Sequence, residues 1–254
     1  TGAAVATVIG QFCGAGMTLY FNTRKNPDIQ ISFKGFRPSA KAIGRIYTVG
    51  LPSIAMQCVG SLMTFGMNLI LMAFSATAVA VFGVYFKLQS FVFMPIFGLN
   101  NGMIPIIAYN YGSRSKKRIM DTAKLSIAIA IGIMLLGLVI FQVFTPQLLM
   151  LFNASDSLLE IGIPALRTIS LSFLFAGYCI ITGSVFQALG NGVYSLIISV
   201  ARQLLCILPL AYIFSHVWGL HAVWFAFPMA EIISTLLTSI LFKRIYNKKI
   251  KVLE

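Results

Sequence analysis

Long apolar segments constrain this chain more than any other feature of its sequence. Seven can be drawn, covering 1–21, 48–74, 76–111, 119–143, 158–189, 193–217 and 219–242. Each is long enough to cross a hydrocarbon core of ~30 Å as a helix. They are continuously apolar and lack the strict alternation of barrel strands. The sequence therefore predicts an all-α integral membrane protein.

The composition agrees with a membrane protein and nearly excludes a soluble enzyme. Of the 254 residues, 58% are hydrophobic and 10% are charged, whereas soluble domains have about 45–50% apolar and about 25% charged residues. The four cysteines all lie within apolar segments and form no C-x-x-C pair. We expect them to be small buried hydrophobic side chains.

The basic residues predict the orientation of the chain in the membrane. Most of the 19 Lys and Arg residues lie in three clusters, within 22–47, 114–124 and 243–251. The connections at 75–78, 144–157 and 214–221 contain neither Lys nor Arg. The clusters thus fall on alternate sides of successive segments, as the positive-inside rule requires.

This alternation assigns each connection to one side. We expect the loop 22–47, the uncharged turn 190–192 and the C-terminus to be cytoplasmic. The stretches 144–157 and 214–221 are then external. Because seven crossings leave the two ends on opposite faces, residue 1 is expected outside.

Four charged residues lie inside apolar segments and away from the segment ends: Lys87, Arg167, Arg202 and Glu231. Such groups are costly in hydrocarbon and usually face a bundle interior or a water-filled cavity. Arg167 can extend to the external interface. For Arg202, extension to the interface or a structural ion pair is as reasonable as a functional role. Lys87 and Glu231 lie deeper in their segments. They are either candidates for a functional role or members of a structural ion pair.

Polar side chains also recur at helical spacing. In 48–74, Gln57, Ser61, Thr64 and Asn68 share one face. Further stripes contain Lys87, Met94 and Asn101 in 76–111, Arg202 in 193–217, and Glu231 in 219–242. For single Ser and Thr residues, we favour a role in hydrogen bonds between helices. For the set of stripes that includes Lys87 and Glu231, we favour the lining of an aqueous cavity.

Motifs for catalysis are missing from the sequence. It contains no H-E-x-x-H, Walker A, G-x-S-x-G or glycine-rich dinucleotide turn. Two histidines, six acids and dispersed cysteines also predict no metal site. We therefore expect no enzyme, no cofactor and no ATP use, so any active transport would draw on an ion gradient.

Several motifs resemble those of one transporter family. They are Gly50-Leu51-Pro52, the run 85–95 (YFKLQSFVFMP), the run 97–105 (FGLNNGMIP), Ala108 to Gly112 and Trp224 to Glu231. Together they resemble the C-terminal half of a multidrug and toxic compound extrusion (MATE) transporter. The resemblance covers the whole chain. It is nearest to the bacterial and archaeal DNA-damage-inducible F proteins and related multidrug exporters.

The resemblance implies a fold and an activity. Family members have twelve transmembrane helices in two six-helix lobes. They export cationic or amphipathic drugs in exchange for H⁺ or Na⁺ by alternating access. On that plan, 1–21 is helix six, 22–47 a cytoplasmic basic linker, 48–242 the lobe of helices seven to twelve, and 243–254 a cytoplasmic basic tail. The implied partners are xenobiotics, the bilayer of the cell (inner or plasma) membrane, and an N-terminal lobe with helices one to five.

The chain departs from the family at its coupling acids. Gly60 stands where some sodium-coupled members have a carboxylate, eight residues after Pro52. Asn101 stands where others have a glutamate on helix eight. The proton-binding aspartate of many members lies on helix one. Coupling is therefore expected chiefly in the other lobe, with Glu231 as the intramembrane acid of this one.

The expected cavity and its hinges follow from these residues. We predict a lining of Gln57, Thr64, Asn68, Lys87, Met94, Asn100, Asn101, Arg202 and Glu231. Pro95 and Pro105 are predicted to act as hinges of the long third segment. Glu231 is expected to pair with Lys87 or Arg202, or to bind the coupling proton.

Three alternatives to a drug antiporter stay open at this point. A flippase for lipid-linked oligosaccharides or peptidoglycan precursors would share the fold but need a more cationic cavity. A membrane-embedded enzyme lacks its cluster of His, Asp or Cys. A structural scaffold leaves polar stripes on four segments unexplained.

Overall fold

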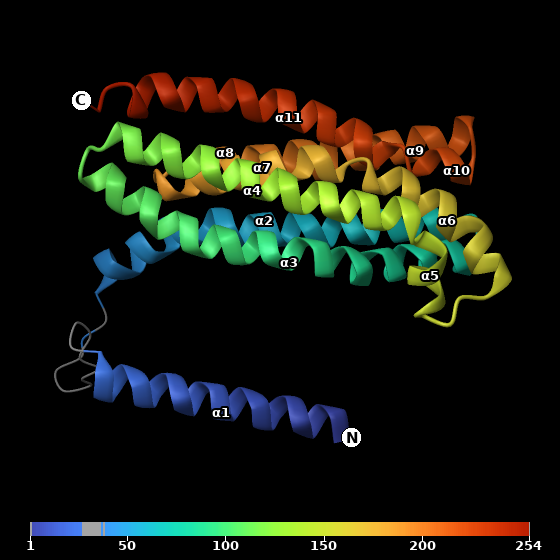
Figure 1. Cartoon of the computed structure of the whole chain (residues 1–254), viewed down its shortest axis with the longest axis horizontal. Helices are drawn as coiled ribbons and strands as arrows, with labels where there is room; N and C mark the ends of the chain where they lie inside the picture. The colour runs from blue at the N-terminus through green and yellow to red at the C-terminus, as the bar shows by residue number, and fades with distance from the viewer. Residues whose placement is uncertain (1, 27–36, 38, 254) are drawn as a thin grey trace. The chain divides into compact units, whose positions relative to one another are not determined.

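The computed structural model describes residues 2–26, 37 and 39–253, and within these it contains helices and no strand (Figure 1). The first helices are α1 (Gly2–Lys25), α2 (Ala40–Met72), α3 (Ala76–Gly112), α4 (Lys116–Val143) and α5 (Thr145–Met150). Next come α6 (Asp156–Ser170), α7 (Phe173–Ala188), α8 (Gly192–Val200), the π-helical turn η1 (Ala201–Ile207) and α9 (Leu208–Val217). The chain continues with α10 (Leu220–Val223), α11 (Ala226–Ile245) and η2 (Tyr246–Ile250).

Six of these helical stretches are long and apolar enough to cross a membrane. A seventh is obtained if α6 and α7, which meet at a bend of 49°, count as one broken span. Each of the seven predicted segments overlaps one of these stretches over most of its length. The prediction of an all-α membrane fold is therefore confirmed.

Several boundaries differ from those predicted. The segment 158–189 is divided at Leu171 and Ser172, and the segment 219–242 is divided between α10 and α11. Helical structure also continues past 242, through η2, into the basic tail. Most of the predicted linker 22–47, together with residue 1, lies outside the described residues or in the ends of α1 and α2.

The chain forms two compact units, 1–46 and 47–254, with the boundary inside α2. The first unit contains α1 and the first turns of α2. The second unit, here called the lobe, contains the rest of α2 and every later helix. All cavities discussed below belong to the lobe.

Local signals define where the helices of the lobe begin and end. The Ser75 side chain accepts a hydrogen bond from the backbone N–H of Ala78 and caps the start of α3. After α7, Gly190 has a φ of +74°, a conformation that glycine adopts without strain. Gly219 ends α9 in the same way with a φ of +77°.

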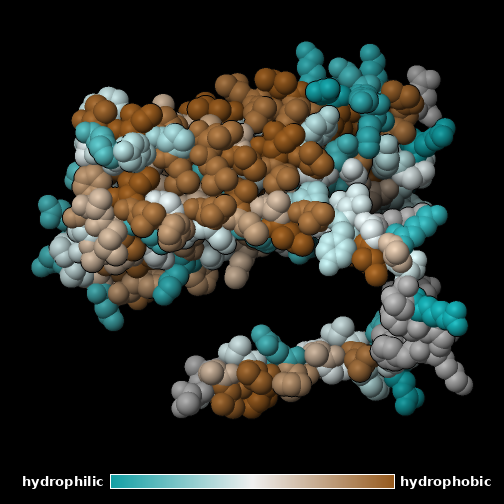
Figure 2. Space-filling model, turned by 180° about the vertical axis from the view of Figure 1, so that it is seen from behind, coloured by the Kyte–Doolittle hydropathy of each residue, from teal (hydrophilic) through white to brown (hydrophobic). Residues whose placement is uncertain are grey.

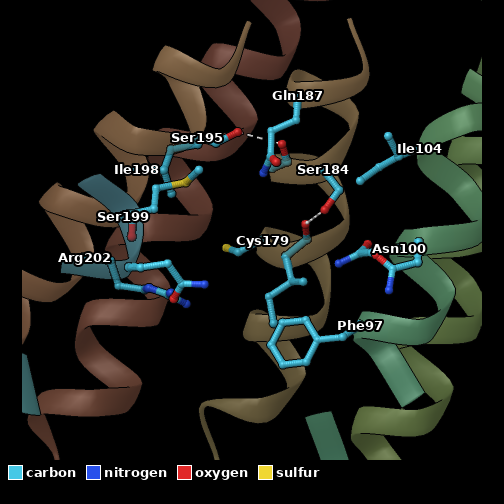
Figure 3. A pocket seen from close by; sticks show the side chains of 15 residues that line it. Phe97, Asn100, Ile104, Cys179, Ser184, Gln187, Ser195, Ile198, Ser199 and Arg202 are labelled. Atoms are coloured by element: carbon cyan, nitrogen blue, oxygen red, sulfur yellow. Dashed lines mark hydrogen bonds between the residues drawn. The ribbon is translucent and has the colours of Figure 1, made fainter. Parts of the chain in front are cut away.

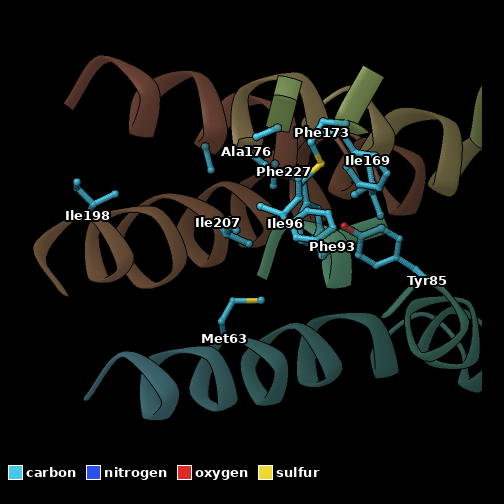
Figure 4. Close-up of a cluster of buried hydrophobic side chains, with 14 of the residues drawn as sticks. Met63, Tyr85, Phe93, Ile96, Ile169, Phe173, Ala176, Ile198, Ile207 and Phe227 are labelled. Atoms are coloured by element: carbon cyan, nitrogen blue, oxygen red, sulfur yellow. The ribbon is translucent and has the colours of Figure 1, made fainter. Parts of the chain in front are cut away.

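The core of the lobe lies where α4 packs on α3 and α7, and where α11 packs on α7 and η1. Phe173, Ile96 and Ile169 meet there (Figure 4), and each is fully buried. The contact between α4 and α7 depends on Gly177. A Cβ at this position would lie 3.0 Å from Met134 Cγ and 3.3 Å from the Ala130 carbonyl oxygen.

The surface of the lobe is apolar around its middle. Leu62, Phe65, Leu125, Leu136 and Ile240 are each more than half exposed. Figure 2 shows hydrophobic side chains over much of the visible face, with hydrophilic ones gathered toward the ends. Contiguous apolar surface of this extent is what a lipid-facing protein presents.

The two basic clusters that belong to the lobe, at 114–124 and 243–251, lie together at one of its ends. The α3–α4 turn and the C-terminus share that end, whereas α5 and α10 lie at the other (Figure 1). Lys249 connects the elements at the basic end. Its ammonium donates a hydrogen bond to the Leu189 carbonyl at 2.8 Å and lies 5.7 Å from the Tyr111 ring centroid.

Candidate functional site

An ion pair inside the lobe joins η1 to α11. Arg202 Nη1 donates a hydrogen bond to Glu231 Oε1 at 2.8 Å. The Arg202 side chain is 23% exposed and that of Glu231 is 9% exposed. The sequence left Lys87 and Arg202 as alternative partners for Glu231, and the structure pairs Glu231 with Arg202.

The π-helical turn that carries Arg202 ends two residues before Pro209. Pro209 lies at the start of α9 and has no N–H to donate to the preceding turn. The backbone from Ala201 to Ile207 adopts the wider i→i+5 pattern, which occurs mostly as single turns and frequently at functional sites. This widened turn places Arg202 opposite Glu231.

The ion pair leaves hydrogen-bonding capacity unused. Glu231 Oε2 and Arg202 Nε are both buried, and neither has a hydrogen-bond partner among the described residues. An unpaired buried polar atom costs about 1–3 kcal/mol. The carboxylate therefore retains one oxygen that a proton or a cation can occupy after a small rearrangement.

Thr235 and Cys179 lie beside the pair. The Thr235 hydroxyl donates to the Glu231 carbonyl at 2.8 Å, and Cys179 Sγ lies 3.4 Å from that hydroxyl oxygen. The first contact lies within α11, and the second joins α7 to α11. They hold the backbone of Glu231 without neutralising its carboxylate.

One cavity of about 420 Å³, here called the amide cavity, opens on the Arg202 side of the pair (Figure 3). Its size lies within the range of about 300–1,000 Å³ that is usual for small-molecule sites. Its polar lining comes from α2, α3, α7, α8 and η1. It consists of Gln57, Asn100, Asn101, Ser184, Gln187, Ser195, Ser199 and Arg202.

The amide cavity contains carboxamides and hydroxyls but no carboxylate among its described lining residues. Asn100 is only 7% exposed, and its Oδ1 has no hydrogen-bond partner in the part of the chain that the structure describes. Ser195 and Ser184 donate instead to carbonyls of α7, at Gly183 and Ile180. The carboxamides supply both donors and acceptors for a polar ligand.

A second cavity of about 240 Å³, here called the aromatic cavity, lies on the Glu231 side. Its lining includes Glu231, Met63 and the rings of Tyr85, Phe86, Phe93, Phe97 and Phe227. Arg202, Phe97 and Ile180 line both cavities. The ion pair therefore stands at the boundary between an amide-rich and an aromatic space.

The structure brings together about half of the predicted site. Gln57, Asn100, Asn101 and Arg202 line the amide cavity, and Glu231 lines the aromatic cavity. The remaining predicted residues line neither. They are Thr64, Asn68, Lys87 and Met94, together with the proposed hinges Pro95 and Pro105.

Those remaining residues have other surroundings. Thr64 bonds to the Gly60 carbonyl, and Met94 is 66% exposed. Lys87 is exposed and points its ammonium at Phe152, 5.8 Å from the ring centroid. α3 runs through both prolines as one continuous helix, so their role as hinges stays a prediction.

Sequence reasoning missed the contribution of α7. Ser184 and Gln187 lie one helical turn apart and face the amide cavity with Gly183 beside them. The small and polar residues at this helical spacing were the signal from which this cavity-lining face could have been predicted. The aromatic lining was also missed, because phenylalanines are too frequent in the chain to mark a site.

Comparison with known proteins places this lobe in a family. The MatE family model matches residues 52–213, which contain α2 beyond its first turns through most of α9. The chain belongs to the MatE family. This membership and the fold confirm the resemblance inferred from the sequence motifs. Because MATE multidrug exporters are transporters, it also confirms the prediction that the chain is no enzyme.

Curated relatives of this MatE chain carry the name multidrug export protein MepA. That of Staphylococcus haemolyticus (strain JCSC1435) is 26% identical over 248 residues, which are 97% of this chain and 54% of the relative. That of Staphylococcus aureus (strain MRSA252) is 26% identical over 232 residues, covering 91% and 51%. The chain thus spans about half the length of these relatives.

Solved structures of similar proteins share the fold over nearly all of the chain. A multidrug resistance MATE family transporter of the MOP superfamily, in an outward-facing conformation, gives a TM-score of 0.90 at 26% identity. The match covers 99% of this chain and 57% of that protein. A MOP superfamily transporter from Pyrococcus furiosus gives a TM-score of 0.88 at 26% identity, covering 99% and 56%.

No group of three or more His, Cys, Asp or Glu side chains that could hold a metal ion occurs within the described ranges. The polar groups that line the two cavities are carboxamides, hydroxyls and the Arg202–Glu231 pair.

Proposed function

We propose that this chain is the C-terminal lobe of an antiporter that exports cationic or amphipathic drugs by alternating access, driven by an H⁺ or Na⁺ gradient. Family membership and the names of the relatives support export of drugs. One observation carries the proposal for this lobe. A buried carboxylate with a free oxygen stands between two cavities of different chemistry.

The pair would respond to a coupling ion through its charge. A proton or cation on Glu231 Oε2 reduces the attraction that holds Arg202. Arg202 then turns more readily into the amide cavity, which changes the relative free energies of two conformations of the lobe. A ligand shifts such an equilibrium only through its differential affinity for the two states.

The two cavities would accept different parts of one substrate. Aromatic rings attract organic cations through their faces, and methionine adapts to varied shapes. The amide cavity adds hydrogen bonds for polar substituents. Gln57, Asn100 and Asn101 are the proposed contacts there, and Phe97 lies at the junction.

The arrangement in the membrane belongs to the proposal as well. We place the basic end of the lobe, and with it the C-terminus, on the cytoplasmic side of the cell membrane. Because the chain spans about half of its relatives, we propose that an N-terminal lobe completes the pathway. The roles of 1–21 as helix six and of 22–47 as a linker are part of the same plan.

The flippase alternative is less favoured by the site. It would need a cationic cavity, yet Arg202 is paired with Glu231 and Lys87 lines neither cavity. We therefore prefer the drug antiporter.

Transport in membrane vesicles tests this function. Inside-out vesicles would be prepared from cells that express the protein encoded by the complete reading frame. Ethidium uptake into the vesicle lumen is then measured with and without an H⁺ or Na⁺ gradient in which the ion concentration is higher inside the vesicles. We expect uptake that depends on one of the two gradients and is absent from vesicles of non-expressing cells. Uptake independent of both gradients would rule out the antiporter.

A further inference from the structure

Lys87 is a charged residue inside a membrane span that the proposed function does not use. It lies eleven residues after the first residue of α3, about 16 Å along the helix. Its side chain is exposed and makes no ion pair with any residue that the structure describes. The ammonium lies 5.8 Å from the Phe152 ring centroid. An unpaired charge in a membrane span usually marks a ligand or a pathway.

An apolar groove of about 510 Å³ begins beside Lys87. Leu88, Val92 and Pro95 line it from α3, Leu136 and Ile140 from α4, and Phe152 from the chain after α5. All of its lining residues are apolar. It shares no lining residue with the amide or the aromatic cavity.

Close approach of two helices forms the floor of this groove. Gly137 on α4 faces Val92 on α3, and a Cβ at 137 would lie 2.4 Å from Val92 Cγ1. Because glycine occupies this position, the helices approach closely below the surface. The larger side chains on either side then form the walls.

The direction of the groove matches that of a lipid tail. Leu88 and Pro95 are seven residues apart, so the groove follows α3 for about 10 Å. α4 runs antiparallel to α3, and its lining residues extend from Ile140 back to 133. Leu88, next to Lys87 in the chain, and Phe152, two residues after α5, mark the end of the groove beside the Lys87 ammonium, and all of the lining residues are apolar.

We propose that this groove binds one acyl chain of an anionic phospholipid, with the lipid phosphate against the Lys87 ammonium. The charge at one end and the apolar length at the other complement an amphiphile of this kind. The three N–H donors of the ammonium can bond phosphate oxygens. The bilayer supplies the lipid, so the site is filled wherever the protein is in its membrane.

This arrangement also accounts for the surroundings of Lys87. α3 would be about 55 Å long as a straight helix, which exceeds the ~30 Å hydrocarbon core. Some of its turns therefore extend past the hydrocarbon, and Lys87 can reach the head-group level by extending along Phe152. A lysine at this level binds anionic head groups through its charge.

Native mass spectrometry of the purified full chain tests the proposal. The protein is equilibrated with either phosphatidylglycerol or phosphatidylcholine of the same acyl chains, and retained lipid is counted after activation. The wild-type chain should retain phosphatidylglycerol preferentially. Lys87→Gln should lower that preference at least threefold, and Leu136→Trp should remove the retained lipid by filling the groove.

Matched variants control for general effects. Lys124→Gln removes a charge from α4 without altering the groove. Leu125→Trp adds the same ring to α4 at a residue that is 64% exposed, compared with 62% for Leu136. Both controls should behave as wild type. Circular dichroism before the measurement confirms that all four variants are folded.

Three results would overturn the proposal. In the first, phosphatidylcholine is retained as well as phosphatidylglycerol. In the second, Lys87→Gln leaves the preference unchanged, which would make the groove an apolar site without head-group recognition. In the third, Leu136→Trp and Leu125→Trp have equal effects, which would place the bound lipid elsewhere. None of these measurements depends on drug transport, so a failure here leaves the proposed antiporter untouched.

Discussion

Arg202 on η1 and Glu231 on α11 share a single hydrogen bond of 2.8 Å, while the second oxygen of Glu231 has no partner among the described residues. The pair is thus tight enough to hold two spans together and incomplete enough to accept another charge. The predictions below follow from this relationship and from the cavities on either side of it.

Replacing one residue of the Arg202–Glu231 pair should destabilise the lobe more than replacing both. Arg202→Met or Glu231→Met alone leaves a buried uncompensated charge, at a cost of about 3–5 kcal/mol in other proteins. The double variant leaves no uncompensated charge and should therefore regain most of the lost stability. Thermal unfolding in one detergent measures all three. A double variant whose loss equals the sum of the two single losses would show that the residues do not interact.

The packing of α4 on α7 predicts a second effect on stability. Gly177→Val should lower stability by about 1–3 kcal/mol, because overpacking forces neighbours to move. The neighbours are Met134 Cγ and the backbone of Ala130, and the backbone has little freedom to shift. Gly132→Val on α4 is the control, since a Cβ there meets nothing within 4 Å. Equal unfolding temperatures for the two variants would contradict the described contact.

The amide cavity predicts which polar residues affect substrate recognition. Asn101→Leu should raise the KM for export of a drug with carboxamide or hydroxyl groups about tenfold, because one lost hydrogen bond costs about 1 kcal/mol or more. Asn68→Leu changes the same residue type outside both cavities and should leave the KM within twofold of wild type. If Asn68→Leu has the larger effect, the substrate binds elsewhere on the lobe.

The proposed orientation can be checked by labelling. In a variant without the native cysteines, Ser157→Cys lies after α5, and Lys117→Cys lies at the basic end. A maleimide that does not cross membranes should label position 157 in intact cells. It should label position 117 only after the membrane is permeabilised. The reverse pattern would invert the orientation derived from the basic clusters.

The membrane fold could be predicted from the sequence because bilayer thickness fixes a minimum length for each span. Every predicted segment overlaps a span for that reason, with α6 and α7 counted as one broken span. The partner of Glu231 was harder to predict from the sequence. Helical spacing shows that Glu231 and Thr235 share a face but does not show which helix that face meets.

Two features show where sequence reasoning ended. The widened turn at η1 changes the direction of Arg202, and Pro209 alone does not specify such a turn. Lys87 was one of two expected partners of Glu231, because both residues lie deep in apolar segments of the sequence. In the structure, the Lys87 ammonium lies 5.8 Å from the Phe152 ring centroid, and Glu231 pairs with Arg202. Helical spacing therefore predicted which polar residues share a face, but it did not predict which residues that face contacts.

Gradient-driven export by the Glu231→Gln protein is the most direct test of the central claim. The complete transporter would be reconstituted into liposomes and compared with Glu160→Gln, which removes an exposed acid from α6. We expect Glu231→Gln to lower the gradient-dependent rate at least tenfold while ethidium binding is retained, and Glu160→Gln to match wild type. An unchanged gradient-dependent rate in the Glu231→Gln protein would contradict a coupling role for the pair in this lobe.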